Sequence, residues 1–488
     1  MGEMGTVKQR AAPTQDVEAL LDRLRSIVGP RAVLTDAEVL EPHLTEWRGL
    51  YRGAATALVE PGTTAEAAEV VAACAAARVA MVPQGGNTGL VGGAIAQARA
   101  GHPEIILGAR RLNRIRDVDA ANYTMTVEAG CVLADLQAAA EEANRLFPLS
   151  LGAEGTCQIG GNISSNAGGI NVLRYGNARD LVLGLEVVLP DGRVYDALRG
   201  LRKNNTGYDL KQLFIGAEGT LGFVTAAVCK LYPRPGSVAT AMLAVADPAA
   251  AIELHSRARD ELGGALAAFE LIGRLPLQLV LDHIPGTREP LDRAHDWYVL
   301  LELAPAGTDA QDQLEHFLAR RHDAGEIGEA MLAHSGAQRD ALWRLRHSIS
   351  EAEKHGGAGI KHDVSVPVSR VAEFIASASA AALAEVPDAK VVAFGHLGDG
   401  NIHFNLQQPP GMDRVAFLDR WEAVSRVVHT TAHEFGGSFS AEHGVGAMKR
   451  DELARLRGGV EYELMRTLKR TLDPHGLMNP GKLFPAAE

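Results

Sequence analysis

The chain has 488 residues, of which 46% are hydrophobic and 22% are charged, and its formal net charge at pH 7 is −12. A chain of this length is too long for one compact core, so we expect two domains with a further structural segment. The acidic balance, with no long run of lysine or arginine, excludes nucleic acid as an expected partner.

The cysteines and the apolar runs indicate the compartment. Cys74, Cys131, Cys157 and Cys229 are scattered without any paired spacing, which predicts reduced thiols. The first fifteen residues hold no apolar stretch typical of a signal peptide, and no later apolar run approaches the ~20 residues of a spanning helix. We therefore expect a cytoplasmic protein with no membrane span.

The first half of the chain alternates strands and helices. Residues 16–28 have apolar positions at helical spacing, so we assign residues 1–44 to a helical preamble. Strands are predicted at 55–61, 81–86, 104–108, 123–130, 181–197 and 222–233, and helices at 63–79 and 133–145. Pro233 and Pro235 then interrupt the pattern, and we place the end of the first domain, residues 45–235, there.

The second half continues the same alternation. Strands are predicted at 239–246 and 297–304, and helices at 250–262, 413–435 and 451–472. We predict an α+β fold in which residues 236–412 form a second α+β domain with an antiparallel sheet and helices. A C-terminal helical segment, residues 413–488, is expected to complete the active site.

A glycine-rich loop follows one of the first predicted strands. The sequence PQGGNTGLVGG at 83–93 can turn several backbone N–H groups inward, as in a nest for a pyrophosphate. It has neither the Gly-Lys-Ser/Thr ending of a Walker A loop nor the spacing of a Rossmann fingerprint. The alternative is a tight structural turn, but further loops rich in small polar residues, at 151–180, 204–225 and 478–484, favour a nucleotide site.

The sequence KVVAFGHLGDGNIHFNLQ at 390–407 predicts a β-hairpin. If the turn is centred between Asp399 and Gly400, His396 and His403 become directly opposed cross-strand partners, and Asn405 shares the face of His403. Two imidazoles so placed can chelate one ion, with Glu442 as the predicted third ligand and its neighbour His443 left for proton chemistry. The alternative is a surface pair of histidines.

A third group of polar residues lies between these segments. Arg346 and Ser350 are four residues apart, one helical turn, so they are expected to share a face, and Lys361 begins the strand predicted to follow. An arginine fork with a lysine point charge suits a carboxylate. The alternative is a solvated helix face with ordinary charges.

These motifs resemble the vanillyl-alcohol-oxidase (p-cresol methylhydroxylase, PCMH) superfamily, and within it the D-lactate, glycolate and D-2-hydroxyglutarate dehydrogenase branch. The resemblance covers residues 45 to 485 and implies a PCMH-type domain with an extended, non-covalent FAD. The FAD-binding positions that it implies are Pro83, Gly85, Gly86, Asn87, Thr88, Gly89, Leu90, Gly155, Thr156, Gly160, Gly161, Ser164, Asn166, Gly169, Glu218, Gly219, Gly222, Val224 and Asn479.

In that branch the motifs HLGDGNIH and AEHG carry the metal ligands and the base. The resemblance therefore implies His396, His403 and Glu442 as ligands of Zn²⁺, or of Mn²⁺, Co²⁺ or Fe²⁺, with His443 as the base. Arg346, Ser350, Lys361 and Asn405 would bind the substrate.

The combination of Arg346, Ser350 and Lys361, together with TEWRGLYRG at 45–53, resembles the D-2-hydroxyglutarate members. D-2-hydroxyglutarate is thus the first expected substrate, with D-malate, D-lactate or glycolate as alternatives. Relatives imply an electron-transfer flavoprotein, a cytochrome or a quinone as acceptor, and the oligomeric state is left open, a homodimer included. A flavin oxidase that uses oxygen and a non-catalytic flavin-binding subunit remain the competing interpretations.

Overall fold

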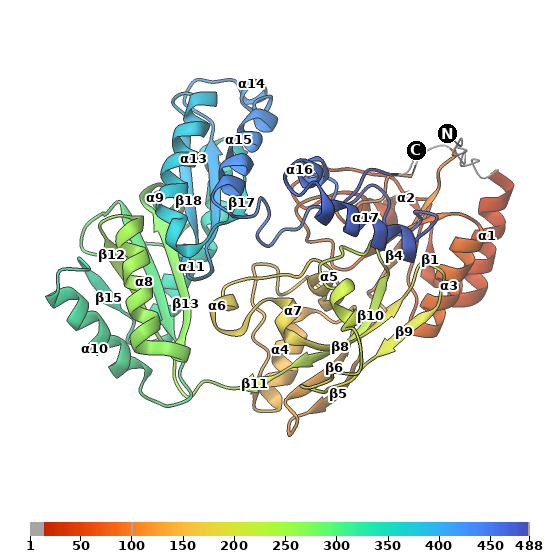
Figure 1. Ribbon diagram of the computed structural model, residues 1–488, viewed down its shortest axis with the longest axis horizontal. Coiled ribbons are helices and arrows are strands. Elements are labelled where there is room, and N and C mark those ends of the chain that lie inside the picture. Colours follow the sequence, from red (N-terminus) through yellow and green to blue (C-terminus); the bar gives the residue numbers. More distant parts are fainter. Residues whose placement is uncertain (1–13, 99–100, 487–488) are drawn as a thin grey trace. The chain divides into compact units, whose positions relative to one another are not determined.

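The structure is a computed structural model that describes residues 14–98 and 101–486, so the N-terminal arm of the predicted preamble lies outside the described residues (Figure 1). The chain divides into two compact units. Unit 1 contains residues 1–168, 177–232 and 442–488, and unit 2 contains residues 169–176 and 233–441. Both units mix helices and strands, which confirms the predicted α+β class.

Unit 1 begins with a small sheet whose strand order is β1-β2-β4-β3. Its elements are α1 (Thr14–Val28), β1 (Val33–Leu34), α2 (Ala37–Leu44), β2 (Ala57–Val59), α3 (Thr64–Ala76), β3 (Ala80–Gln84) and β4 (Glu104–Gly108). Helix α3 supplies the crossover that makes β2 and β3 parallel to each other, and both strands pair with β4 in parallel. Thr63 begins this helix by accepting the backbone N–H of Glu66 on its side chain.

A five-stranded antiparallel sheet, in the order β5-β6-β10-β8-β9, forms the rest of the unit 1 core. Its strands are β5 (Ile115–Asp119), β6 (Thr124–Glu128), β8 (Val182–Val188), β9 (Val194–Ala197) and β10 (Phe223–Lys230), and the accompanying elements are α4 (Leu133–Glu142), β7 (Arg145–Leu146), α5 (Ile159–Ser164), α7 (Ala178–Leu181) and β11 (Tyr232–Pro233).

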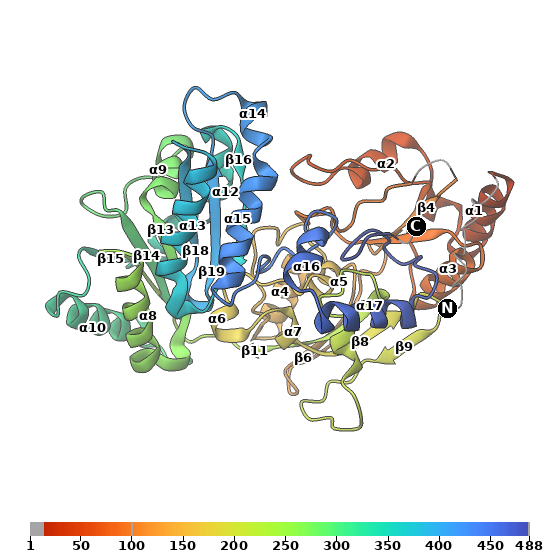
Figure 2. The same ribbon diagram turned by 45° about the horizontal axis from the view of Figure 1, so that its top comes forward.

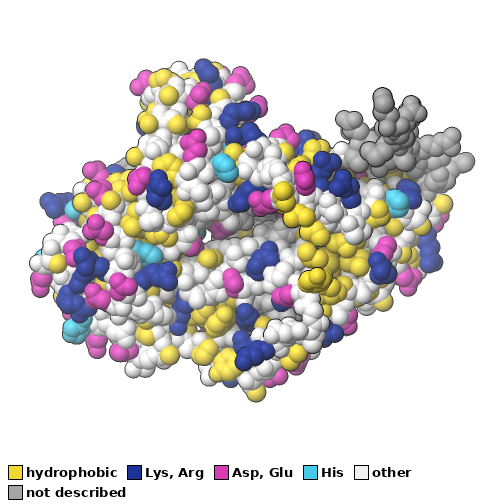
Figure 3. All heavy atoms as spheres, viewed as in Figure 1, with side chains coloured by type: hydrophobic (Ala, Val, Ile, Leu, Met, Phe, Trp, Pro, Cys, Tyr) yellow, Lys and Arg dark blue, Asp and Glu magenta, His cyan; other side chains and the backbone are white. Residues whose placement is uncertain are grey.

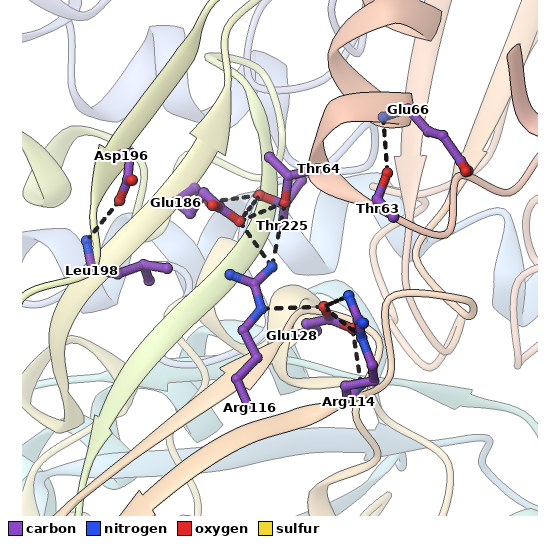
Figure 4. A network of polar contacts seen from close by, with 10 residues as sticks. All are labelled: Thr63, Thr64, Glu66, Arg114, Arg116, Glu128, Glu186, Asp196, Leu198 and Thr225. Carbon is purple, nitrogen blue, oxygen red and sulfur yellow. Dashed lines mark hydrogen bonds and ion pairs between the residues drawn. The ribbon is translucent and has the colours of Figure 1, made fainter.

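A buried polar network joins this sheet to helix α3 (Figure 4). Arg116 donates to Glu128 at 3.1 Å and to Glu186 at 3.1 Å, so one guanidinium links strands β5, β6 and β8. The hydroxyl of Thr64, at the start of α3, donates to the same carboxylate of Glu186 at 2.5 Å. Arg114 adds further bonds to Glu128, whose side chain is fully buried. The hydrogen bond from Thr64 therefore ties α3 to a carboxylate whose charge is paired with Arg116 within the sheet.

Unit 2 is a three-layer structure around an eight-stranded sheet, in the order β15-β12-β14-β13-β18-β19-β16, with β17 also paired to β19. The strands are β12 (Ala239–Val245), β13 (Leu266–Gly273), β14 (Trp297–Leu303), β15 (Ala330–Leu332), β16 (Gly359–Ile360), β17 (Asp363–Ser365), β18 (Lys390–His396) and β19 (Asn401–Gln407). The helices are α6 (Val172–Tyr175), α8 (Pro248–Leu262), α9 (Arg274–His283), α10 (Ala310–Asp323), α11 (Gly336–His347), α12 (Ile349–Ala352), α13 (Val371–Glu385), α14 (Arg414–Leu418) and α15 (Trp421–Glu434).

Side-chain alternation along the strands gives this sheet two apolar faces. Leu243 of β12 packs in one core with α8, α10, α13 and α15, whereas its neighbour Met242 packs in the other core with α9, α11 and α12. Figure 2 shows α13 and α15 on their side of the sheet. The face of the sheet covered by α9, α11 and α12 is largely apolar, so polar side chains buried on it are exceptions and indicate a site.

The two long helices predicted near the C-terminus are each interrupted. The segment 413–435 is divided into α14 and α15, and the segment 451–472 into α16 (Arg450–Leu456) and α17 (Val460–Leu472), because Gly458 and Gly459 end the first of them. The first pair belongs to unit 2 and the second to unit 1, so the segment predicted as one piece, 413–488, is shared between the units.

Single turns of 3₁₀-helix fill several connections: η1 (Pro30–Ala32), η2 (Leu210–Leu213), η3 (Gly263–Ala265), η4 (Glu353–Gly356), η5 (Val368–Arg370) and η6 (Leu397–Asp399). All four cysteines are buried free thiols, as predicted. Within the described ranges no helix is both long and apolar enough to span a bilayer. On the face drawn in Figure 3, basic and acidic side chains are interspersed rather than separated into patches of one sign.

The network of Figure 4 predicts a stability effect. The substitution Glu128→Gln removes the charge that Arg114 and Arg116 share, and we expect it to lower the free energy of unfolding by about 3 kcal/mol. Denaturant titration of the wild-type and Glu128→Gln proteins measures this change. Asp191→Asn, in the exposed pair with Arg193, is the control and should cost less than about 1 kcal/mol. Equal effects of the two substitutions would contradict the importance of the network.

Candidate active site

The hairpin of β18 and β19 brings the two predicted imidazoles together, but not in the predicted register. His396 lies opposite Asn401, and His403 lies opposite Phe394, so the two histidines are diagonal neighbours and the predicted direct pairing is wrong. The reason is the turn, which takes four residues: η6 occupies Leu397–Asp399, and Gly400 follows with φ +80°. The rings still share one face, with centroids 5.7 Å apart.

Glu442 is the third member of this group. The amide of the preceding residue, Ala441, donates to the carbonyl of Asp363 in β17 at 3.2 Å, and Asp363 is the strand partner of His403. One ligand atom from each of His396, His403 and Glu442 lies within 4.8 Å of the others. Two nitrogens and one carboxylate oxygen at that spacing suit a divalent metal of borderline hardness, with a further coordination position left for substrate.

A buried carboxylate, Glu270 of β13, contacts both His396 and Arg346. Glu270 is the strand partner of His396, and Nδ1 of His396 lies 2.6 Å from its Oε1. Its other oxygen, Oε2, accepts a bond from Nε of Arg346 at 2.6 Å. Burial alone raises the pKa of Glu270, but the charges and hydrogen bonds of His396 and Arg346 outweigh it and lower the pKa to about 2. Glu270 is therefore a carboxylate and accepts both bonds.

A second buried carboxylate, Glu353 of η4, organises two other predicted substrate residues. Its oxygens accept bonds from Nζ of Lys361 at 2.7 Å and from the side-chain amide of Asn405 at 2.9 Å. Ser350 does not join them. Helix α11 ends at His347 and Ser350 belongs to the short helix α12, where it is exposed while Arg346 is buried, so the predicted shared face is interrupted.

A separate cavity in unit 1 is lined by the predicted flavin loops. Of the predicted residues, the lining includes Pro83, Gly85, Gly86, Asn87, Thr88, Gly89, Gly160, Gly161, Ser164, Glu218, Gly219 and Val224. Leu90, Gly155, Thr156, Asn166, Gly169, Gly222 and Asn479 are not among the lining residues. His443 does line it, as do several residues that were not predicted: Gln84, Val91, Gly93, Ala94, Ala109, Cys157, Gln158, Asn162, Ser165 and Phe223.

The cavity has the features of a ligand cradle. A Cβ added at Gly89 or Gly161 would meet no atom within 4 Å, so these glycines leave open space over their backbone. The side-chain oxygens of Gln158 and Asn162, both in the lining, are buried without a hydrogen-bond partner. A ligand with N–H or O–H donors, such as FAD, would satisfy such acceptors. The residues present therefore fit a flavin nucleotide.

Glu218 fixes the chain next to His443. Its carboxylate accepts the backbone N–H groups of Val445 and Gly446, each at 2.7 Å, and its backbone carbonyl accepts the amide of Asn479 at 2.7 Å. Burial raises the pKa of Glu218, and the two backbone bonds act in the opposite direction. Asn479, though outside the cavity lining, thus holds the residue that positions the segment after His443.

Sequence reasoning missed the two supporting carboxylates. Glu270 stands in the run LAAFELIG, which forms the fully buried strand β13, and a lone acid in such a run is a signal that could have been followed. Glu353 lies in a polar stretch, EAEKHGG, and no local pattern separates it from its exposed neighbours. Its partners, Lys361 and Asn405, come from two other segments.

Two protein-family models match the chain. The FAD binding domain matches residues 55–197, and the C-terminal domain of FAD linked oxidases matches residues 234–483. Similar curated proteins carry the name D-2-hydroxyglutarate dehydrogenase. The protein of Stutzerimonas stutzeri is 37% identical over 470 residues, covering 96% of this chain and 99% of the relative. The mitochondrial protein of Bos taurus is 39% identical over 480 residues, covering 97% and 84%.

Solved structures show the same fold at low identity. The crystal structure of p-cresol methylhydroxylase with substrate bound has a TM-score of 0.76 and 17% identity, over 97% of this chain and 98% of the other. The isoeugenol complex of 4-ethylphenol oxidase from Gulosibacter chungangensis has a TM-score of 0.72 and 17% identity, over 97% and 98%. The predicted PCMH-type fold is confirmed.

The open space over the glycines gives a test of the cradle. Gly161→Val fills space that the protein itself does not use, so we expect FAD affinity to fall at least about tenfold while the melting temperature of the FAD-free protein stays unchanged. Gly152→Val is the control, because that glycine also has open space but lies outside the lining. Equal FAD affinity of the two variants, measured by fluorescence titration, would place the flavin elsewhere.

Proposed function

Because the chain belongs to the FAD-linked oxidases and is an FAD-dependent D-2-hydroxyacid dehydrogenase, we propose that it oxidises D-2-hydroxyglutarate to 2-oxoglutarate with the help of a divalent metal. The observation that carries this proposal is the grouping of His396, His403 and Glu442, followed directly in the chain by His443, which lines the flavin cavity. The names of the similar enzymes support the choice of substrate.

The substrate would be held through its carboxylates. Arg346 keeps one guanidinium nitrogen, Nη2, buried and without a hydrogen-bond partner, which suits it to receive a carboxylate. Lys361, 30% exposed in its side chain, supplies a second positive charge, and Asn405 supplies an amide on the face of the hairpin that carries His403. Ser350, although exposed, remains a proposed contact. A dicarboxylic 2-hydroxy acid fits this set better than lactate does.

Oxidation removes a proton from the hydroxyl group and a hydride from the carbinol carbon. His443 would take the proton, a role suited to an imidazole near neutral pH. His396, His403 and Glu442 would hold a metal ion, Zn²⁺ by preference or Mn²⁺, Co²⁺ or Fe²⁺, which as a Lewis acid makes the hydroxyl more acidic. Bound FAD supplies the acceptor for the hydride.

We further propose that a separate electron carrier, such as an electron-transfer flavoprotein, a cytochrome or a quinone, takes the electrons from the reduced protein in the cytoplasm. Turnover of D-2-hydroxyglutarate with a dye acceptor, without matching formation of hydrogen peroxide under air, distinguishes this function from an oxidase. D-malate, D-lactate and glycolate measured beside it rank the substrates.

The proton-accepting role predicts the behaviour of one variant. His443→Asn should slow the bleaching of oxidised flavin by D-2-hydroxyglutarate at least about 1,000-fold, because proton transfer to a placed base contributes that order. FAD content should stay at the wild-type level. His433→Asn, an exposed histidine on α15, is the control. Bleaching of the His443→Asn protein at the wild-type rate in anaerobic stopped-flow would contradict the assignment.

The metal requirement is tested by removal. Chelation, verified by elemental analysis, should lower kcat/KM at least about 100-fold with FAD still bound, and added Zn²⁺ or Mn²⁺ should restore it. His403→Asn should reproduce the loss. His295→Asn should not, because His295 contacts Glu329 and lies outside the group of proposed ligands. A metal-free preparation with full activity would refute the metal's role.

A further inference from the structure

We propose that Glu270 is a positioning residue that fixes, with one carboxylate, both the proposed metal ligand His396 and the proposed substrate-binding Arg346. The inference rests on the proposed function, since it concerns the same site. Its basis is local to unit 2: Glu270 is buried in β13, and its two oxygens lie 2.6 Å from Nδ1 of His396 and 2.6 Å from Nε of Arg346.

The first consequence concerns the tautomer of His396. A carboxylate can only accept, so Nδ1 of His396 carries the proton and donates it to Glu270. In a neutral ring, the form that binds a metal, the lone pair is then on Nε2, which is the nitrogen directed away from Glu270. A metal ion binds the nitrogen that lacks the proton, and a carboxylate on the other nitrogen makes the ligand more basic. Glu270 thereby prepares His396 as a ligand before any ion arrives.

The second consequence concerns the orientation of Arg346. Its Nε is used by Glu270, and its guanidinium carbon lies 5.0 Å from the ring centroid of Phe394, so the plane of the group is held on two sides. Phe394 also contacts the ring of His403, with centroids 4.9 Å apart. The buried Nη2 has no hydrogen-bond partner in the protein, which leaves it for an anion.

Together these contacts fix the spacing between the imidazole of His396, which would hold the ion, and the guanidinium of Arg346. Because one side chain sets both ends, a substrate must span a set distance from its hydroxyl group to its far carboxylate. D-2-hydroxyglutarate has that second carboxylate and D-lactate lacks it, so Glu270 should control the preference between them. Glu353 fixes Lys361 and Asn405 without touching any of the three proposed ligands, so it should influence substrate binding alone.

The same sheet offers a control: a half-buried acid on the face that carries Glu270. Glu302 of β14 accepts bonds from Thr240 at 2.7 Å and from the indole N–H of Trp343 at 2.6 Å, and it contacts none of the proposed ligands. Glu302→Gln therefore reports what the loss of a hydrogen-bonded acid on this face does to the sheet in general.

The test compares Glu270→Gln, Glu353→Gln and Glu302→Gln in the FAD-loaded protein. The Zn²⁺ dissociation constant, measured without substrate by competition with a chromogenic chelator, should rise about 10- to 100-fold for Glu270→Gln and stay within about twofold for the other two. The preference for D-2-hydroxyglutarate over D-lactate in kcat/KM should fall for Glu270→Gln and Glu353→Gln and stay for Glu302→Gln. Wild-type Zn²⁺ affinity of Glu270→Gln, or an equal loss in Glu302→Gln, would overturn the proposal.

One measurement needs no active enzyme. In the metal-free wild-type protein labelled with ¹⁵N-histidine, the His396 ring should show protonated Nδ1 and unprotonated Nε2, with the signal assigned by its loss in His396→Gln. The opposite tautomer would overturn the proposal even if the enzyme is metal-dependent. The expected tautomer in a protein that binds no Zn²⁺ would contradict the proposed function and still support the positioning role of Glu270.

Discussion

The pairing of β13, β18 and β19 is the constraint on which the candidate site depends. In antiparallel strands only alternate residues share a face, and opposite residues are close enough for their side chains to touch. That rule places Glu270 against His396 and puts His403 and Asn405 on the same side. A shift of one residue in either pairing would turn these groups toward the other core, so the sheet register and the chemistry are fixed together.

Buried polar groups differ in whether the protein itself supplies their hydrogen-bond partners. In the network of Figure 4 both carboxylate oxygens of Glu128 and Oε1 of Glu186 accept bonds from donors of the protein. In the cavity of unit 1, by contrast, the side-chain oxygens of Gln158 and Asn162 have no hydrogen-bond partner. In unit 2, Nη2 of Arg346 also has none. An unsatisfied buried group costs stability, and a bound ligand is one way in which the missing bond is supplied. Both units thus carry polar groups that the protein alone does not complete.

Features that depend on residues close together in the chain could be predicted from the sequence, whereas features that depend on distant residues could not. The strand over residues 104–108 and the hairpin over 390–407 were predicted well because their patterns are local. The diagonal placement of His396 and His403 was not predicted, because the Gly-Asp-Gly sequence does not indicate that the turn contains the short helix η6. Glu270 was missed because its partners lie 76 and 126 residues away in the chain.

The charges at the candidate site also restrict how it can bind an anion. Arg346 and Lys361 are each paired with a buried carboxylate, Glu270 and Glu353, so these four groups have no net charge between them. A pair that is already neutral attracts an anion through directed N–H donors more than through long-range charge. An ion held by the histidines, as proposed, would supply the positive charge that these four groups lack, so metal binding and substrate affinity would be two parts of one electrostatic balance.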